Sequence, residues 1–484
     1  MTDTQRSHTV EKIGGTSMSR SHELRDTLFI GNRSGAALYN RVFVVSAYGG
    51  ITDLLLEHKK TGTPGVFGLF SNNDSDGAWI DALNRTAEAM CAAHAAILED
   101  DADREMADRF VRERIAGAQS CLVDLQRLCS YGHFRLDEHM MTIRELLSGL
   151  GEAHSAFSTV LMLRRAGINA RFVDLSGWRD EGRHSLDERI TAAFSGIDLA
   201  AELPVVTGYA QCTEGLMKSY DRGYSEVTFA RLAVLTGAAE AIIHKEFHLS
   251  SADPGIVGVE RVRKIGHTNY DVADQLSNMG MEAIHPSAAK QLRRAGIPLR
   301  VTNAFEPDDP GTLIDDSEAG KARVEMITGL GVYAVELVEQ DMVGVKGYDS
   351  AILDVLARHK VWIVSKTTNA NTITHYLNAP LKAVRRVERD LARLYPNAGL
   401  SARNLAVVAV IGRSLKGLKV MARGLTALDE AGIEPVGMQK TTRDVEAQFI
   451  VPKDQMQEAI RVLHGALVET AGEKGRRQSP RLVA

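Results

Sequence analysis

The fold is decided by RVFVVSAYGGITDLLL, residues 41–56, in which an apolar run is followed by two glycines and a helical pattern. The apolar run, FVVSA, shows no polar alternation, so both faces of the strand it predicts should be buried. Strands of that kind are typical of a parallel sheet covered by helices. The stretch therefore predicts an α/β domain with three layers, α, β and α.

A second stretch, VEKIGGTSMSR at residues 10–20, also places two glycines after an apolar strand. Such a pair is most often a tight turn, because glycine tolerates a positive φ. With Lys12 before the glycines and two hydroxyl groups after them, the same stretch could instead cradle a phosphate group. On its own it does not distinguish the two.

Farther along the chain, residues 79–130 have helical periodicity and predict a helical excursion from the sheet. Strand-like and helix-like stretches then alternate from ARFVDLS (170–176) to PLRVTN (298–303), as in a parallel α/β sheet. After residue 325 two segments of about 70 residues share one pattern of strand, helix, strand and strand, and each contains KTT (366–368 and 440–442). Paired units of this type either bind a small effector or serve as a dimerisation platform.

These changes in pattern predict an α/β domain at 1–325, βαββ units at 326–400 and 401–471, and a flexible tail at 472–484. The 484 residues carry a net charge of -5, which argues against a general nucleic-acid binder. Four cysteines without metal-ligand spacing favour a reduced, cytoplasmic setting, and no metal-binding site is expected from side chains alone. No apolar stretch is long enough to predict a membrane span, and no secretory signal is evident at the start.

Four polar clusters follow predicted strands of the first domain, where ligands bind in open α/β sheets. They lie at residues 12–17, 46–52, 149–152 and 220–228. Together they offer a lysine, an arginine, hydroxyls, carboxylates and glycine-flanked N–H groups, which suit a transferring phosphoryl group. No GxxxxGK[ST] motif is present, and no GxGxxG follows a strand in this domain. The pattern alone predicts an α/β enzyme that handles anions.

The same motifs, in order, resemble those of the aspartate kinases. VEKIGGTSM resembles VxKFGGTSV, VVSAYGGITDLLL resembles VVSAxxGxT[DN]xL, SSADPGIV resembles TxDPRxV, and NAFEPDDPGTLI resembles NxFxPxxxGTxI. The resemblance implies the amino-acid-kinase fold followed by tandem ACT domains. It also implies transfer of the γ-phosphoryl group of ATP to the β-carboxylate of L-aspartate, with Mg²⁺ as cofactor, in a homodimer or larger homo-oligomer.

Roles follow from the resemblance, position by position. Lys12 and Glu226 would be catalytic. Substrate would be bound by Ser46, Thr52, Glu152, Arg222 and Ser225. The nucleotide would be bound by Gly14, Gly15, Ser17, Lys245, Glu246 and Asp253. A small effector would meet Met342, Gly347 and Tyr348 in the first ACT-like unit. The glycine pair of VEKIGGTSMSR is thereby interpreted as a phosphate cradle.

The chain departs from the family pattern mainly around the nucleotide. The family's LGRGGSD is YDRGYSE here, which places Tyr224 at a glycine position and Glu226 at an aspartate position. Glu246 replaces the aspartate that ends the nucleotide strand, and Glu282 replaces a lysine. A tyrosine at a glycine position could block the approach of phosphates to the backbone. Two other readings therefore stay open: a non-catalytic effector-binding homologue, and a kinase of another amino-acid carboxylate.

Two finer expectations come from the same comparison. KIGGTSMSR, KEFHLSSADP and NYDVADQLSNMGMEAIHP resemble the aspartate kinases encoded with ectoine biosynthesis genes. In the first ACT-like unit, Val345 and Val364 stand where lysine-inhibited relatives offer a hydroxyl and an acid. Burying an ammonium without a carboxylate partner is costly. We therefore expect lysine inhibition to be weak or absent.

Overall fold

The computed structural model describes residues 7–59, 61–72, 76–220, 223–281, 284–317 and 321–469. It contains two compact units. One holds the chain up to His248 together with Ile284–Asp316, and the other holds Leu249–Ala283 and the chain from Ser317 onward. The predicted tail at 472–484 lies outside the described residues. Across the part of the chain that the structure describes, no helix is both long enough and apolar enough to cross a membrane.

The strands of the first unit are β1 (Thr9–Ile13), β2 (Arg41–Val45), β3 (Ala170–Val173), β4 (Leu203–Thr207), β5 (Glu240–Lys245), β7 (Leu299–Asn303) and β8 (Thr312–Asp315). They lie in the order β3-β4-β2-β1-β5-β7-β8. The pairings are parallel except that β7 and β8 are antiparallel. Every residue of β2 is buried, as its apolar run predicts.

The helices of this unit are α1 (Gly15–Met18), α2 (Ser21–Leu24), α3 (Ile51–Leu55), α4 (Val66–Asn72), α5 (Asp76–Ile97), α6 (Asp101–Cys129), α7 (Met140–Arg165), α8 (Leu186–Phe194), α9 (Leu216–Tyr220), α10 (Tyr224–Thr236) and α13 (Pro286–Arg294). A π-helical turn, η1, follows α2 at Arg25–Phe29. Helices α7 and α10 pack on one face of the sheet. On the other face, Phe43 of β2 meets Phe29 of η1 edge to face, which completes the three predicted layers.

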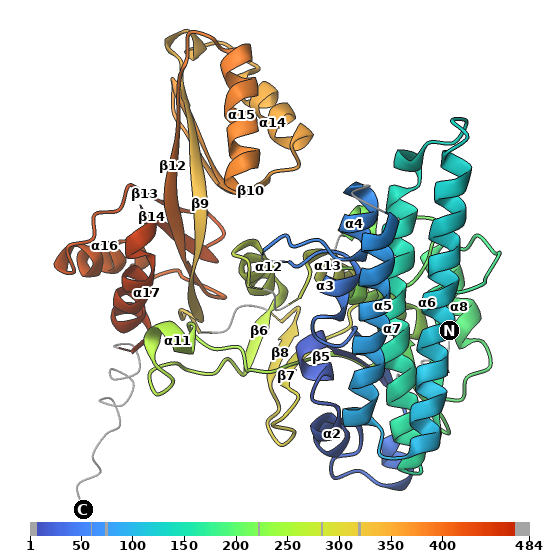
Figure 1. The fold of residues 1–484 in the computed structure, drawn as a ribbon. Coiled ribbons are helices and arrows are strands. Elements are labelled where there is room, and N and C mark those ends of the chain that lie inside the picture. The colour runs from blue at the N-terminus through green and yellow to red at the C-terminus, as the bar shows by residue number, and fades with distance from the viewer. Residues whose placement is uncertain are drawn as a thin grey trace, which may run out of the picture. The chain divides into compact units, whose positions relative to one another are not determined.

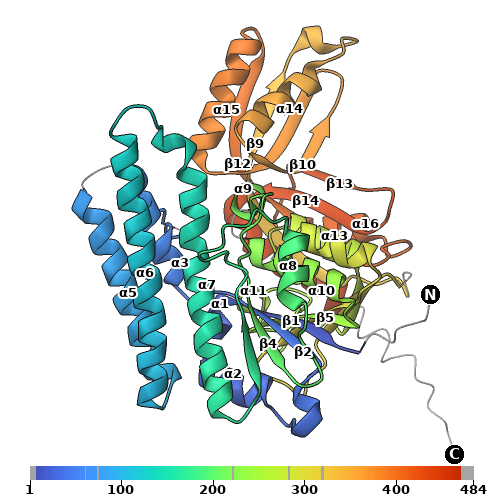
Figure 2. The same ribbon diagram turned by 90° about the vertical axis from the view of Figure 1, so that its right-hand side faces the viewer.

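The helical excursion predicted at 79–130 is confirmed as α5 and α6, which lie beside α7 (Figures 1 and 2). Asp100 interrupts the run, since its side chain accepts the N–H of Asp103 at 3.2 Å and caps the start of α6. This helical layer joins the sheet through α7, which packs on β3 and β4.

The second unit contains α11 (Pro254–Val257), β6 (His267–Asn269), α12 (Tyr270–Asn278), β9 (Met326–Val338), α14 (Tyr348–Arg358), β10 (Trp362–Thr368), β11 (Thr372–Asn378), α15 (Leu381–Leu394), β12 (Gly399–Ile411), α16 (Val420–Glu430), β13 (Gly437–Lys440), β14 (Glu446–Pro452) and α17 (Met456–His464). Its sheet has the order β10-β11-β9-β12-β14-β13. The repeated βαββ pattern is confirmed, and each copy is followed by a further helix, α15 or α17.

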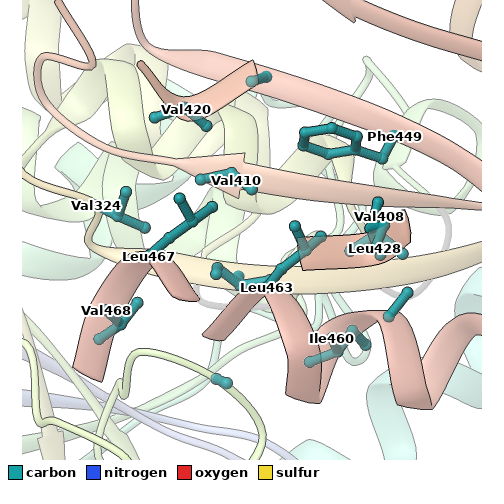
Figure 3. Close-up of a cluster of buried hydrophobic side chains, with 14 of the residues drawn as sticks. Val324, Val408, Val410, Val420, Leu428, Phe449, Ile460, Leu463, Leu467 and Val468 are labelled. Carbon is teal, nitrogen blue, oxygen red and sulfur yellow. The ribbon is translucent and has the colours of Figure 1, made fainter. Parts of the chain in front are cut away.

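The two copies share their longest strands. β9 and β12 each span 13 residues and pair antiparallel along their whole length, as Figure 1 shows. The half of β9 near Val335 packs into the core of the first copy. Its start at Ile327 packs into the core of the second copy, which also contains Phe449, Leu463 and Leu467 (Figure 3). Two hydrophobic cores therefore lie under one continuous sheet.

The segment Leu249–Ala283 belongs to this second unit, although its sequence position is within the predicted catalytic domain. Ala252 and Val257 are buried in the same core as Phe449. Thr268 of β6 donates to the buried carboxylate of Glu325, which also pairs with Arg413. The predicted domain boundary at residue 325 stays a prediction. The two compact units are each built from segments that are separated in the sequence, so no single position divides them.

Candidate active site

Parallel pairing aligns the carboxyl ends of the central strands at one edge of the first unit's sheet. In register, Ile13 of β1 lies opposite Val45 of β2 and His244 of β5, and Val45 lies opposite Thr207 of β4. The loops that follow these four strands therefore meet at this edge. They begin at Gly14, Ser46, Gly208 and Glu246. This is where an open α/β sheet binds its ligands.

The loop after β1 has open space beside its backbone at Gly14. A Cβ atom built on Gly14 would meet nothing within 4 Å. At Gly15 the same atom would lie 2.6 Å from the carbonyl oxygen of Ala47, so only glycine fits. Ser17, which is buried, donates from Oγ to Oε1 of Glu246 at 2.5 Å and ties this loop to the end of β5.

Lys12 projects from β1 toward α10. Its Nζ lies 3.6 Å from Oε1 of Glu226, and both side chains are mostly buried. The other carboxylate oxygen of Glu226 accepts the backbone N–H of His285, at the start of α13. The glutamate therefore fixes the position of the lysine ammonium while one of its own oxygens is fixed by α13.

Glu152 is the deepest acid of the site. It is 2 % exposed, and within the described residues its Oε2 has no hydrogen-bond partner. Burial raises the pKa of Glu152 to about 8, although the backbone of Tyr209, the Lys12 ammonium and the side chain of Tyr224 act in the opposite direction. A buried carboxylate with a vacant acceptor oxygen is suited to a cationic group of a ligand.

Hydroxyl groups line the same region. Oγ of Ser46 lies 3.5 Å from Oγ of Ser225, and Ser155 donates to the carbonyl oxygen of Ser46 at 2.8 Å. Thr52 is half-buried in the first turn of α3, which begins after Gly50 at a φ of 84°. The structure thus brings Lys12, Ser46, Glu152, Ser225 and Glu226 together at one sheet edge.

Tyr224, at the position where the family has glycine, points into the interior. It is buried, its ring meets that of Tyr209 edge to face at 5.6 Å, and its side chain hydrogen-bonds toward Glu152. Its side chain is therefore directed to the core beside the acid. Arg222 and Glu282 lie outside the described residues.

The remaining predicted residues lie at the end of β5 and in the second unit. Lys245 is half-buried at the end of β5. Asp253 belongs to the second unit, where its side chain accepts the N–H of Gly255 at 2.8 Å and caps α11. In the first βαββ copy, Met342 is in the core, Gly347 precedes α14 with a φ of 105°, and Tyr348 stacks on Tyr395.

Sequence reasoning missed two residues of this site. A Cβ on Gly208 would lie 2.6 Å from Cβ of Ser225 and 3.0 Å from Oε2 of Glu152, so this glycine allows the two side chains to approach β4. The signal was available, because Gly208 follows the buried strand in PVVTGYA. The role of His285, through its backbone N–H, had no signal in the sequence.

Comparison with known proteins agrees with this geometry. Residues 8–303 match the model of the amino acid kinase family, so the chain belongs to that family. It is 52% identical to aspartate kinase Ask_Ect of Stutzerimonas stutzeri, over 96% of this chain and 98% of that protein. Within the family, the chain is therefore an aspartate kinase, an enzyme that uses ATP.

More distant relatives are consistent with this. The chain is 25% identical to the aspartokinase of Schizosaccharomyces pombe, over 69% of this chain and 71% of that one. Among solved structures, Escherichia coli aspartokinase III in complex with lysine and aspartate matches 96% of this chain and 100% of its own, with a TM-score of 0.71 and 19% identity. At that identity the likeness supports the fold: a kinase domain followed by ACT domains.

Proposed function

We propose that this enzyme transfers the γ-phosphoryl group of ATP to the β-carboxylate of L-aspartate, with the residues of the sheet edge in the roles given below. The observation that carries the proposal is the placement of Lys12 and Glu152 at one edge, beside hydroxyls, with Oε2 of Glu152 lacking a hydrogen-bond partner among the described residues. Both reactants are anionic, so catalysis needs positioning and positive charge more than covalent chemistry.

On the substrate side, Glu152 binds the ammonium group of aspartate. Ser46, Ser225 and Thr52 donate hydroxyl hydrogen bonds to carboxylate oxygens, and Arg222 holds the α-carboxylate in a bidentate pair. The role of Arg222 rests on the resemblance in sequence. Glu152 gains most from the ligand, because the incoming ammonium gives its buried oxygen a partner.

On the nucleotide side, Lys12 stabilises charge on the transferring phosphoryl group, and Glu226 orients the lysine. The open backbone at Gly14 fits a phosphate group, with Gly15, Ser17 and Lys245 around it. Mg²⁺ is usually held by one or two carboxylates together with substrate phosphates, and Glu246 is the carboxylate of this site that fits. When bound, Mg²⁺ supplies charge neutralisation at the phosphates. Asp253 is proposed for the nucleotide on sequence resemblance alone.

The ACT pair is proposed to regulate the enzyme in a homodimer or larger oligomer, and the pathway to be ectoine biosynthesis, on the resemblance in sequence. We also propose weak or absent inhibition by lysine. Val364 is buried at 5 % exposure, and Nζ of Lys366 lies 2.6 Å from the carboxylate of Asp349 at the start of α14. The carboxylate of Asp349 is thus already paired with an ammonium of the chain itself.

The proposal is tested by trapping acyl phosphates as hydroxamates with purified enzyme and Mg-ATP. L-aspartate, L-glutamate and N-acetylglutamate are compared as acceptors, with and without millimolar lysine. We expect product from L-aspartate alone and little change with lysine. Turnover of N-acetylglutamate, which has no free ammonium, would contradict the role of Glu152. Absence of product and of ATP binding would favour the non-catalytic reading.

A further inference from the structure

A cluster of metal-ligand side chains lies in the helical layer of the first unit, between α5 and α6. Cys91 and His94 are one turn apart on α5, and Asp108 faces them from α6. Their ligand atoms, one from each residue, lie within 4.8 Å of one another. A sulfur, an imidazole nitrogen and a carboxylate oxygen form the kind of donor set that zinc takes in proteins.

The cluster continues to α7 through a second histidine. Nδ1 of His94 lies 2.7 Å from Oδ1 of Asp108, and its Nε2 lies 2.8 Å from Nε2 of His154. Both rings are 1 % exposed. Over the described residues, Nδ1 of His154 has no hydrogen-bond partner of normal geometry.

The lack of a partner at Nδ1 of His154 depends on which ring nitrogens of the two histidines carry protons. When a neutral His94 donates from Nδ1 to Asp108, its Nε2 can only accept, so His154 must donate from Nε2. Nδ1 of His154 is then a buried acceptor without a donor. When Nδ1 of His94 instead gives its lone pair to a cation, the direction of the hydrogen bond between His94 and His154 reverses. Nε2 of His94 then donates to Nε2 of His154, and the proton of His154 moves to Nδ1.

We propose that Cys91, His94 and Asp108 bind one zinc-class divalent ion, with His154 as the hydrogen-bonded support of the ligand His94. Three protein ligands leave the fourth tetrahedral position to water. Binding replaces the thiol proton of Cys91, which passes to solvent, by a sulfur–metal bond. Arg112 pairs with the other oxygen of Asp108 at 3.2 Å but is 70% exposed, so it can turn toward solvent.

The ion would join α5 to α6 and, through the two histidines, to α7. His154 lies two residues after Glu152 on α7, and its ring meets that of Tyr48 edge to face at 5.1 Å. Tyr48 belongs to the loop between Ser46 and Thr52. The metal site is separate from the substrate residues, yet it is connected to two of the segments that carry them.

The test uses the full chain, treated with a chelator and kept reduced, and titrates Zn²⁺ against a chromophoric competitor. We expect one zinc per chain, with affinity lowered at least about tenfold in Cys91→Ser and Asp108→Asn. Two variants serve as matched controls and should bind zinc like the wild type: Cys129→Ser on α6, and His248→Ala in a second cluster of potential metal ligands, with Glu306 and Asp309. Co²⁺ should give a thiolate charge-transfer band that Cys91→Ser lacks.

Arg112→Ala keeps all three ligands and removes a competing cation, so we expect it to bind zinc more tightly than the wild type. This variant keeps the proposal testable if a ligand variant fails to fold, which circular dichroism would reveal. Failure of the wild type to bind zinc stoichiometrically would overturn the proposal. So would equal affinity in the wild type and a folded Cys91→Ser variant.

Discussion

At the scale of single residues, the site depends on a carboxylate held away from water. Among the described residues, Oε2 of Glu152 has no hydrogen-bond partner, and burial raises the pKa of Glu152 to about 8. We expect Glu152→Gln to raise the KM for aspartate about 10- to 100-fold, the cost of one hydrogen bond to a charged group, and to change the KM for ATP little. Steady-state kinetics with each substrate varied in turn measures this. A larger effect on ATP than on aspartate would contradict the assignment.

The pH dependence of the same residue has a definite sign. Below a pH of about 8 the carboxyl group of the free enzyme is mostly neutral, and only the ionised form pairs with an ammonium. We therefore expect kcat/KM for aspartate to rise with pH, with the midpoint of the rise near pH 8, and to level off only above it in the wild type. Glu152→Gln should lack this rise. A wild-type profile that falls over the same range would contradict the raised pKa.

Gly208 allows a prediction about close packing. Alanine there would force apart β4, Ser225 and Glu152, since its Cβ would lie 2.6 Å from that of Ser225. We expect Gly208→Ala to lower kcat/KM for aspartate about 10- to 100-fold. The control is Gly77→Ala in α5, where an added Cβ meets nothing within 4 Å and activity should not change. Equal activity of the two variants would contradict the role of Gly208.

Most of the assembled site could be predicted at this scale. Lys12 lies in a buried strand, Ser46 follows one, and Glu152 and Ser225 lie on helices that pack beside them, so these residues could be predicted from their positions in the pattern. The orientation of Tyr224 could not be predicted, because the sequence shows that a side chain replaces glycine but not which way it points. The group formed by Cys91, His94 and Asp108 could not be predicted, because its side chains come from two helices and the cysteine spacing alone gave no signal.

At the scale of elements, β11 carries a buried histidine whose charge state is coupled to stability. His375 is 1 % exposed, and burial, followed by the nearby Lys366, lowers its pKa to about 4. The native ring stays neutral below pH about 6.5, where the unfolded ring takes up a proton. Stability should therefore fall as the pH falls through this range.

We expect His375→Gln to reduce that loss. Thermal unfolding of wild type and variant between pH about 7 and about 5 measures it, and the fall in Tm on acidification should be smaller in the variant. His359→Gln is the control, because His359 is hydrogen-bonded to Asp390 at 2.8 Å near the surface. Parallel falls in the wild type and His375→Gln would contradict the prediction.

The βαββ repeats could be predicted because their periodicity and KTT segments recur. Their shared strands could not. β9 and β12 run through both copies, and each strand has one end in each hydrophobic core. Similarity between two segments of sequence indicates where each copy begins, but not that a strand extends into the other copy. Pairing between strands that are distant in the chain depends on tertiary contacts, which local pattern does not encode.

At the scale of the whole molecule, the chain leaves its catalytic unit at Leu249 and returns at Ile284. The sequence pattern of residues 249–283 does not indicate that this segment leaves the catalytic unit, because its short strand and helices resemble those of an α/β sheet. The segment is held in the second unit by its apolar residues, including Ala252 and Val257. The chain therefore passes between the kinase unit and the second unit at three points.

Val257→Asp tests this grouping. A buried charge in the second core should lower thermal stability and hydrogen-exchange protection in β14 and α17, with much less effect in β1 and β2. The matched control is Val259→Asp, since Val259 is 77% exposed and should tolerate the charge. Loss of protection centred on the first unit would show that the segment is held there instead.

The central claim is that the cradle at Lys12 transfers phosphate to the side-chain carboxylate of aspartate. The most direct measurement is the identity of the trapped hydroxamate, determined by mass spectrometry, with wild type and Lys12→Ala compared at saturating aspartate. We predict β-aspartyl hydroxamate from the wild type and a rate about 10²- to 10³-fold lower from Lys12→Ala, with aspartate binding retained. An α-hydroxamate, or undiminished turnover without Lys12, would contradict the account.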